Sequence, residues 1–157
     1  MSDTIVLLED KKETTTFLLD EGTGTETRVV TGTGEQLATV YSDPIGVDDV
    51  VSISDKSEIG AHAVKKYEDG DIILGIAINE PLNNSNRGMR ETGVLVLGQL
   101  FRLKLAEGQT NISVKDRISL SENGAIADTS GLYVALHAVE DQADYEYLDV
   151  VKPFAFP

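Results

Sequence analysis

The stretch Ile118-Ser-Leu-Ser-Glu-Asn-Gly-Ala-Ile126 decides the fold class, because it predicts two strands joined by a tight turn. Asn123 and Gly124 both tolerate the positive φ values that a type I′ turn requires, and apolar residues flank them on each side. The residues before the turn alternate, with Val114, Ile118 and Leu120 on one face and basic residues on the other. This stretch therefore predicts a β-hairpin.

Further strands are predicted on both sides of this hairpin. They cover Val50–Ile53, Ile72–Ile78, Val94–Leu105, Val114–Leu120, Leu132–Val139 and Tyr145–Val151. Ile72–Ile78 is nearly all apolar, which is typical of a strand buried on both faces. Residues 56–66 are ambiguous, because Asp55 and Glu58 form a possible helix capping box while Gly60 weakens a helix. Residues 79–93 are polar and predict a long loop.

The first 43 residues differ in composition from the rest. Ten of the thirteen Thr residues lie between Thr4 and Thr39, and two Gly-Thr-Gly stretches, residues 22–24 and 32–34, lie ten residues apart. Neither stretch extends to a dinucleotide or P-loop motif. We expect an N-terminal arm or accessory β segment over 1–43, a barrel domain over 44–151 and a tail over 152–157. The predicted fold is all-β: a small β-barrel or sandwich with a Thr/Gly-rich arm and at most one short helix.

The chain has 157 residues, a formal net charge of −14 and no Cys. Its acidity opposes nucleic acid and anionic membranes as partners, since both are polyanions. The acids are either an ordinary solvated surface or an adaptation to high salt. The sequence has no apolar run long enough to span a bilayer and no basic N-terminal signal, so we expect a soluble protein.

A search for chemistry finds no established motif. His62 and His137 are the only histidines, and no short spacing between them and acids predicts a metal site. Glu68, Asp69 and Asp71 lack the ligand series of an EF-hand. We therefore expect no catalytic residue, no metal and no cofactor, although a triad assembled in space is not revealed by sequence.

One basic segment contrasts with the acidic background. Residues 87–117 carry a net charge of +3, from Arg87, Arg90, Arg102, Lys104, Lys115 and Arg117 against three acids. If the strands that carry these bases are neighbours, they form a cationic strip that faces an acidic partner. The alternative is ordinary pairing with nearby acids.

The tail offers a second candidate contact. Phe154 and Phe156 either insert into a neighbouring subunit or fold back on this chain.

The order of these elements resembles the small β-barrel capsid cement, or head decoration, proteins of tailed phages and related archaeal viruses. The resemblance rests on Gly70-Asp-Ile-Ile-Leu-Gly-Ile-Ala77, Gly93-Val-Leu-Val-Leu-Gly98, Val114-Lys-Asp-Arg-Ile118, the Asn-Gly hairpin and Gly131-Leu-Tyr-Val-Ala-Leu136. It covers about residues 68–151, and Lys115 stands where that family often has Gly.

The resemblance implies a non-enzymatic protein on the outer capsid surface of a virion, made in the host cytoplasm, with the major capsid protein and further copies of itself, often three, as partners. The alternatives are another virion component such as a tail, turret or baseplate barrel, an all-β trimeric nucleotide hydrolase that needs Mg²⁺, or a small-molecule-binding barrel.

Overall fold

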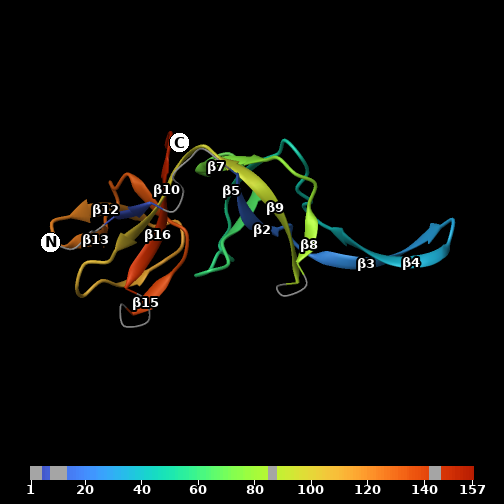
Figure 1. Cartoon of the computed structure of the whole chain (residues 1–157), viewed down its shortest axis with the longest axis horizontal. Coiled ribbons are helices and arrows are strands. Elements are labelled where there is room, and N and C mark those ends of the chain that lie inside the picture. The colour runs from blue at the N-terminus through green and yellow to red at the C-terminus, as the bar shows by residue number, and fades with distance from the viewer. Residues whose placement is uncertain (1–4, 8–13, 85–87, 142–145) are drawn as a thin grey trace.

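The computed structural model describes residues 5–7, 14–84, 88–141 and 146–157. Within these ranges the chain forms sixteen strands and no helix, which confirms the prediction of an all-β fold (Figure 1). None of the described segments is a helix that is long and apolar enough to cross a membrane. Residues 56–66, which were ambiguous in the sequence, hold a β-bridge between Glu58 and Ala61 and then a strand.

Five strands close on themselves to form a β-barrel, called the barrel below. They are β2 (Thr14–Asp20), β5 (Val50–Ile53), β6 (Ala63–Lys66), β7 (Ile73–Ala77) and β9 (Met89–Val96). The closure is complete because β2 pairs in parallel with β6 on one side and antiparallel with β9 on the other. A short strand, β8 (Leu82–Asn84), adds to the start of β9.

A second sheet, called the curled sheet, has the order β1-β10-β16-β14-β12-β13. Its strands are β1 (Ile5–Leu7), β10 (Gly98–Lys104), β12 (Arg117–Ser121), β13 (Gly124–Ala127), β14 (Tyr133–Ala135) and β16 (Tyr147–Pro153). A parallel bridge joins Ala125 of β13 to Leu105, the residue that directly follows β10. The strands β11 (Thr110–Ile112) and β15 (Val139–Asp141) pair with each other. Through Ile112 and Val139 they pack on the hydrophobic core of the curled sheet.

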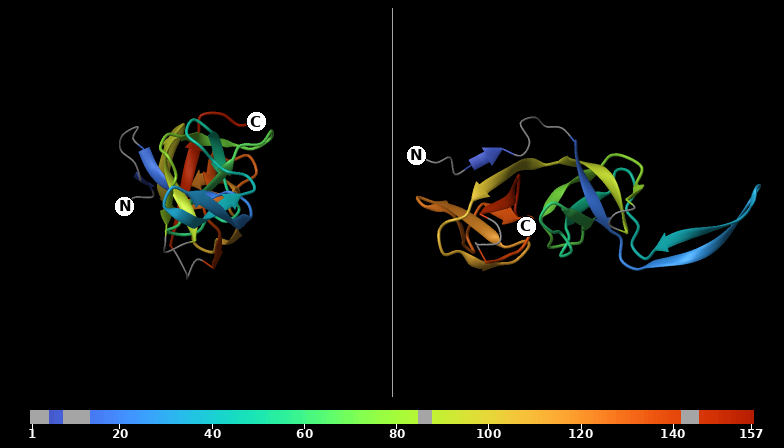
Figure 2. Two further views of the ribbon diagram at one scale, coloured as in Figure 1. Left: turned by 90° about the vertical axis from the view of Figure 1, so that its right-hand side faces the viewer. Right: turned by 60° about the horizontal axis from the view of Figure 1, so that its bottom comes forward.

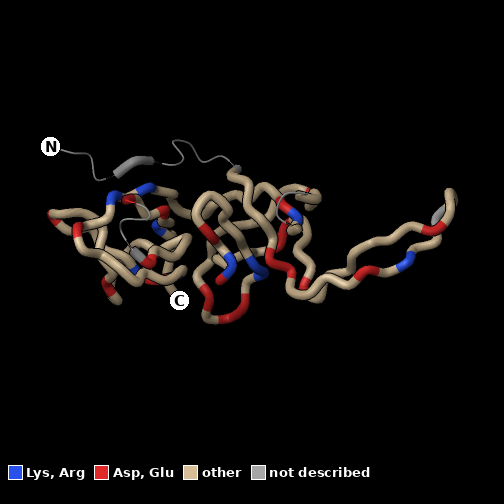
Figure 3. Tube along the Cα trace, turned by 90° about the horizontal axis from the view of Figure 1, so that it is seen from below, with Lys and Arg blue, Asp and Glu red and all other residues tan. Residues whose placement is uncertain are grey.

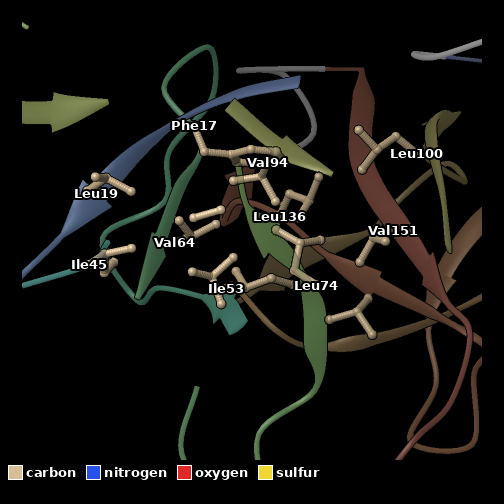
Figure 4. Close-up of a cluster of buried hydrophobic side chains, with 13 residues drawn as sticks. Phe17, Leu19, Ile45, Ile53, Val64, Leu74, Val94, Leu100, Leu136 and Val151 are labelled. Carbon is tan, nitrogen blue, oxygen red and sulfur yellow. The ribbon is translucent and has the colours of Figure 1, made fainter. Parts of the chain in front are cut away.

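The barrel and the curled sheet share one continuous hydrophobic core (Figure 4). Leu74, Val64 and Val94 of the barrel pack in the same cluster as Leu100 and Val151 of the curled sheet. Each fully buried side chain of this size contributes about 1.5–3 kcal/mol relative to an exposed one. The interface is thus hydrophobic enough to hold the two units together.

Strand β16 is buried on both faces because it separates two cores. Leu148 and Val150 point into the core of the curled sheet, and Val151 points into the core shared with the barrel. Asp149, on the same face as Val151, is 2% exposed. Alternation along a strand sends successive side chains to opposite faces, so each core takes every second residue.

The segment between β2 and β5 projects from the barrel as a long hairpin. It consists of β3 (Gly24–Thr31) and β4 (Gly34–Tyr41), paired over their whole length, and it is called the projecting hairpin below. It points away from the barrel and the curled sheet (Figure 1, and the right-hand view of Figure 2). The two Gly-Thr-Gly stretches of the sequence form its base and its tip. Within the predicted arm of residues 1–43, Thr14–Asp20 is a strand of the barrel, and the segment that projects is the hairpin over residues 24–41.

The prediction of a loop over 79–93 is wrong for its described part. Residues 82–84 and 89–96 are paired strands, and the polar Thr92 is buried with its hydroxyl donating to the carbonyl of Asn79. The predicted single strand Val94–Leu105 is also wrong. Strand β9 ends at Val96 in the barrel, and β10 begins at Gly98 in the curled sheet. Gly98 has a φ of +133°, and a Cβ there would lie 2.4 Å from the carbonyl oxygen of Lys152, so only glycine fits this corner.

The predicted hairpin around Asn123 is confirmed, but its turn is not the one expected. Ser121 pairs with Gly124, so the two-residue loop is Glu122–Asn123, and Gly124 begins β13 with a φ of +128°. The preceding strand is shorter than predicted and begins at Arg117.

Candidate functional site

A buried ion pair fixes the base of the projecting hairpin. Glu21, 2% exposed, accepts hydrogen bonds from the backbone nitrogen of Ile45 at 2.9 Å and from Arg90 Nε at 2.8 Å. The hydrogen bond from Arg90 to Glu21 raises the pKa of Arg90. The guanidinium of Arg90 also lies over the Tyr41 ring, 5.0 Å from its centroid. Arg90, predicted as a contact for a partner, therefore holds the hairpin to the barrel.

The two faces of the projecting hairpin differ in charge. Cross-strand partners lie on the same face, and the register Thr25↔Val40 and Arg28↔Leu37 separates the side chains into two sets. The charged face contains Glu26, Val30, and the exposed Arg28–Glu35 ion pair of 3.4 Å. The uncharged face consists of Thr25, Thr27, Val29, Gln36, Ala38 and Val40. Figure 3 shows how few charged residues the hairpin carries in comparison with the rest of the chain.

Apolar side chains of the hairpin are open to solvent. Val30 is 81% exposed, Leu37 67% and Val40 56%. A two-stranded hairpin without a third layer is marginally stable in water, and its outer edges have unpaired backbone groups. A hairpin of this length and composition is typical of a segment that packs on another molecule. The projecting hairpin is therefore the candidate functional site.

The predicted cationic strip does not form, because β10 and β12 are not neighbours in the curled sheet. Arg102 pairs across the strands with Asp149, with Nε 2.8 Å from Oδ1. Lys115 Nζ lies 2.7 Å from an exposed carboxylate oxygen of Asp55. Arg102 and Lys115 therefore pair with acidic side chains of their own chain.

The remaining predicted contact residues have separate environments. Arg117 donates to the carbonyl of Gly131 at 2.8 Å, and its guanidinium carbon lies 3.9 Å from the centroid of the Phe156 ring. Phe156 is partly buried against the shared core, which is the fold-back alternative for the tail. Phe154 stays 63% exposed. Lys104 lines an open hollow of about 780 Å³ at the rim of the curled sheet. Arg87 lies outside the described residues.

A buried carboxylate lies where the barrel meets the curled sheet. Asp149 accepts hydrogen bonds from Arg102 and from His62, whose Nε2 is 3.0 Å away. Burial alone would raise the pKa of Asp149, but the hydrogen bonds from His62 and Arg102 outweigh it and lower the pKa to about 2. The His137 ring stacks on His62, with centroids 6.0 Å apart.

His137 is held neutral in this cluster. Its Nδ1 lies 3.0 Å from the carbonyl oxygen of Ala138, and its Nε2 accepts the backbone N–H of Asp149 at 3.0 Å. A ring nitrogen that accepts carries no proton, so Nδ1 is the donor. Burial lowers the pKa of His137 despite the hydrogen bond to Ala138. Sequence reasoning missed this cluster, since only the register of β10 and β16 brings Arg102 opposite Asp149.

The histidine–carboxylate pair has no nucleophile directed at it among the described contacts. Ser57 Oγ donates to the carbonyl of Leu136 at 2.6 Å and accepts from Ala63, so its hydroxyl is part of the backbone network. Nδ1 of His62 is buried and has no hydrogen-bond partner among the described residues. His62 borders a cavity of about 150 Å³, a volume suited to a few water molecules. No group of three or more His, Asp or Glu in the described ranges could hold a metal ion.

Comparisons with family models, with curated proteins and with solved structures found no match for this chain.

Proposed function

We propose that this protein is a non-enzymatic decoration protein of a viral capsid, which attaches to the outer surface of the particle. The single observation that carries the proposal is the projecting hairpin, whose uncharged face and open apolar side chains lie well outside the molecule's own core. A protein that covers a lattice needs a rigid body and a segment that reaches its neighbours. On this proposal its partners are the major capsid protein and further copies of itself.

Two further observations support the resemblance on which the virion assignment rests. A Cβ on Gly131 would lie 2.2 Å from the carbonyl oxygen of Ile118, so the glycine at the start of the closing strand is required by packing. Lys115, which stands where the family often has Gly, has a φ of +73°. That left-handed conformation is one that glycine adopts at little cost.

The high density of copies on a capsid makes a modest contact sufficient. Each copy binds weakly through a small surface, and repetition of the contact over the lattice gives strong overall attachment. The net charge of −14 keeps the outer surface of the decorated particle soluble.

The test is binding of the full chain to empty capsids assembled from the major capsid protein encoded in the same genome. The matched control replaces residues 24–41 by Asn-Gly. Thr23 and Ser42 are already hydrogen bonded to one another at 2.9 Å, so a two-residue turn connects them. We expect the full chain to co-sediment with capsids to saturation and the shortened chain to lose at least tenfold in occupancy. Absence of the full chain from the capsid fraction would contradict the proposal, and its presence on tails would assign it to another part of the virion.

A further inference from the structure

Two histidines lie within reach of one carboxylate oxygen where the barrel meets the curled sheet. Nε2 of His62, the residue before β6, is 3.0 Å from Oδ2 of Asp149, and Nε2 of His137 is 4.0 Å from the same oxygen. At 4.0 Å His137 is beyond hydrogen-bond distance, so His62 holds this oxygen. Arg102 binds the other oxygen, Oδ1, at 2.8 Å. These four residues are called the histidine cluster below.

His62 cannot take up a proton where it lies. The pKa of Asp149 is about 2, so its carboxylate is charged, and Nε2 of His62 is the donor to it. The other ring nitrogen, Nδ1, then carries a lone pair. Nδ1 is buried and has no hydrogen-bond partner among the described residues. A proton added there would be a buried donor without an acceptor on a charged ring, which costs more free energy than an unused lone pair.

His137 cannot take up a proton in its present position either. Its Nε2 accepts the backbone N–H of Asp149 at 3.0 Å, and its Nδ1 donates to the carbonyl of Ala138. A proton on Nε2 would place two N–H groups face to face. Burial lowers the pKa of His137, and the nearby His62 and Arg102 act in the same direction. The carbonyl of Ala138 and the carboxylate of Asp149 oppose this shift without cancelling it.

Acid therefore charges the histidine cluster only by rearranging it. We propose that a proton taken up by His137 makes it replace His62 on Oδ2 of Asp149, so that His62 turns out into solvent. The direction of the exchange follows from burial, because the side chain of His62 is already 19% exposed and that of His137 is 0% exposed. The two rings are parallel within 6°, with centroids 6.0 Å apart, so one can approach the oxygen as the other leaves.

The exchange gives each proton of the charged ring an acceptor. Nε2–H of His137 then donates to Oδ2 of Asp149, while Nδ1–H keeps the carbonyl of Ala138. The backbone N–H of Asp149 gives up its acceptor, and this cost keeps the exchange from occurring while His137 is neutral. The displaced ring of His62 has an acidic neighbour, because Glu91 of β9 lines the cavity that His62 borders.

The result is a switch in the contact between the two units. The exchange removes a polar contact between the barrel and the curled sheet, whereas the hydrogen bond from Ser57 to the carbonyl of Leu136 and the shared core remain. The units therefore stay together while their contact loosens. Asp149 stays charged over the range in which histidines titrate, so the switch responds to mild acid before that carboxylate takes up a proton. The inference does not depend on the proposed function.

NMR of the imidazole nitrogens of the full chain tests the exchange, because the chain has two histidines. At neutral pH we expect His62 with its proton on Nε2 and His137 with its proton on Nδ1. On titration from about pH 7 to about pH 4.5, both rings should gain a proton in one step, and the signals of His62 should move to those of a solvated imidazolium. The inference is overturned if His137 stays neutral, if His62 becomes charged while it remains bound to Asp149, or if the chain unfolds without a separate step.

Two matched variants identify the ring that drives the exchange. In His137→Gln the side-chain oxygen can accept the N–H of Asp149, but the amide takes no proton, so His62 should keep its bond to Asp149 throughout this range. In His62→Gln the amide still donates to Asp149 and is neutral, so His137 should still become charged and bind Oδ2. The opposite pattern, with the step lost in His62→Gln and kept in His137→Gln, would show that the proton enters at His62 and would contradict the inference.

Discussion

Nε2 of His62 lies 3.0 Å from Oδ2 of Asp149, and this contact joins the barrel to the curled sheet between residues 87 positions apart in sequence. Asp149 sits between this histidine and Arg102, beside the hydrophobic cluster that the two units share. A buried carboxylate in such a place costs free energy unless its partners remain.

The first prediction concerns the charge of that carboxylate. Asp149→Asn keeps the size of the side chain but removes the buried negative charge that Arg102 and His62 bind. We expect the free energy of unfolding to fall by about 2 kcal/mol, measured by urea titration. The control Asp55→Asn makes the same change at a side chain that is 82% exposed, and it should cost less than about 0.5 kcal/mol. Equal effects of the two substitutions would contradict the role of Asp149.

The second prediction is a loss of stability in acid. The pKa of Asp149 is about 2 in the folded chain against 3.8 for an ordinary Asp, so the unfolded chain takes up the proton first. The difference contributes about 2 kcal/mol above about pH 4, and this is lost as the pH falls toward 2.

His137 acts in the same direction at higher pH. Its pKa is lowered from 6.5, so below that pH the unfolded chain gains a proton that the folded chain does not take. Stability should therefore begin to decline below about pH 6.5. Melting temperatures between pH 8 and pH 2 test both effects, and Asp149→Asn should flatten the decline below pH 4. An unchanged slope in that variant would show that other carboxyls carry the acid response.

A third prediction concerns the close approach at Gly131. A Cβ there would meet the backbone of Ile118 at 2.2–2.7 Å, and backbone atoms do not yield easily. Gly131→Ala should lower the free energy of unfolding by more than about 2 kcal/mol. Gly32→Ala is the control, because nothing lies within 4 Å of its Cβ, and it should be neutral within about 0.5 kcal/mol.

A fourth prediction follows from the backbone of Lys115. Its φ of +73° costs about 1 kcal/mol for a residue with a side chain, and its exposed ion pair with Asp55 returns less than that. Lys115→Gly should therefore raise the melting temperature by a few degrees. Lys104→Gly, within strand β10, should lower it. A lower melting temperature for Lys115→Gly would mean that the ion pair outweighs the strain.

The fifth prediction addresses the acidic surface. The screening length falls from about 10 Å at 0.1 M salt to about 3 Å at 1 M, so repulsion among the 27 acids weakens. We expect the melting temperature to rise steadily with KCl up to 2 M. A protein whose acids are merely an ordinary solvated surface would show little change, and that result would remove the high-salt interpretation.

The sequence was sufficient for the fold class because strand periodicity is local. Val50–Ile53 is a strand with the predicted bounds, and the hairpin near Asn123 is where the turn residues indicate. The sequence did not predict the strand boundary at Gly98, because the alternating leucines continue on both sides of the position where β9 ends and β10 begins. The loop prediction for 79–93 failed because polar residues of this segment find partners inside the fold, as Arg90 does with Glu21 and Thr92 with the carbonyl of Asn79.

The candidate site was only partly accessible from sequence. The Thr-rich, Gly-Thr-Gly-bounded segment pointed to an extended element, but its faces are defined by the register, which no local pattern specifies. The prediction that the basic residues form one cationic strip failed for the same reason, because strand order is not encoded in a local pattern. Arg90 and Arg102 have buried acidic partners that lie 69 and 47 residues away, and such pairing is decided by tertiary structure.

Strand β16 cannot shift its register by one residue, because both of its faces are buried. One inserted residue would place the carboxylate of Asp149 in the hydrophobic core of the curled sheet and would turn Val150 toward His62. Each of the two cores therefore constrains the register of β16 with respect to the other core. Any attempt to graft the curled sheet onto a different scaffold would have to transplant β10, β16 and β14 together with the facing surface, as a single block.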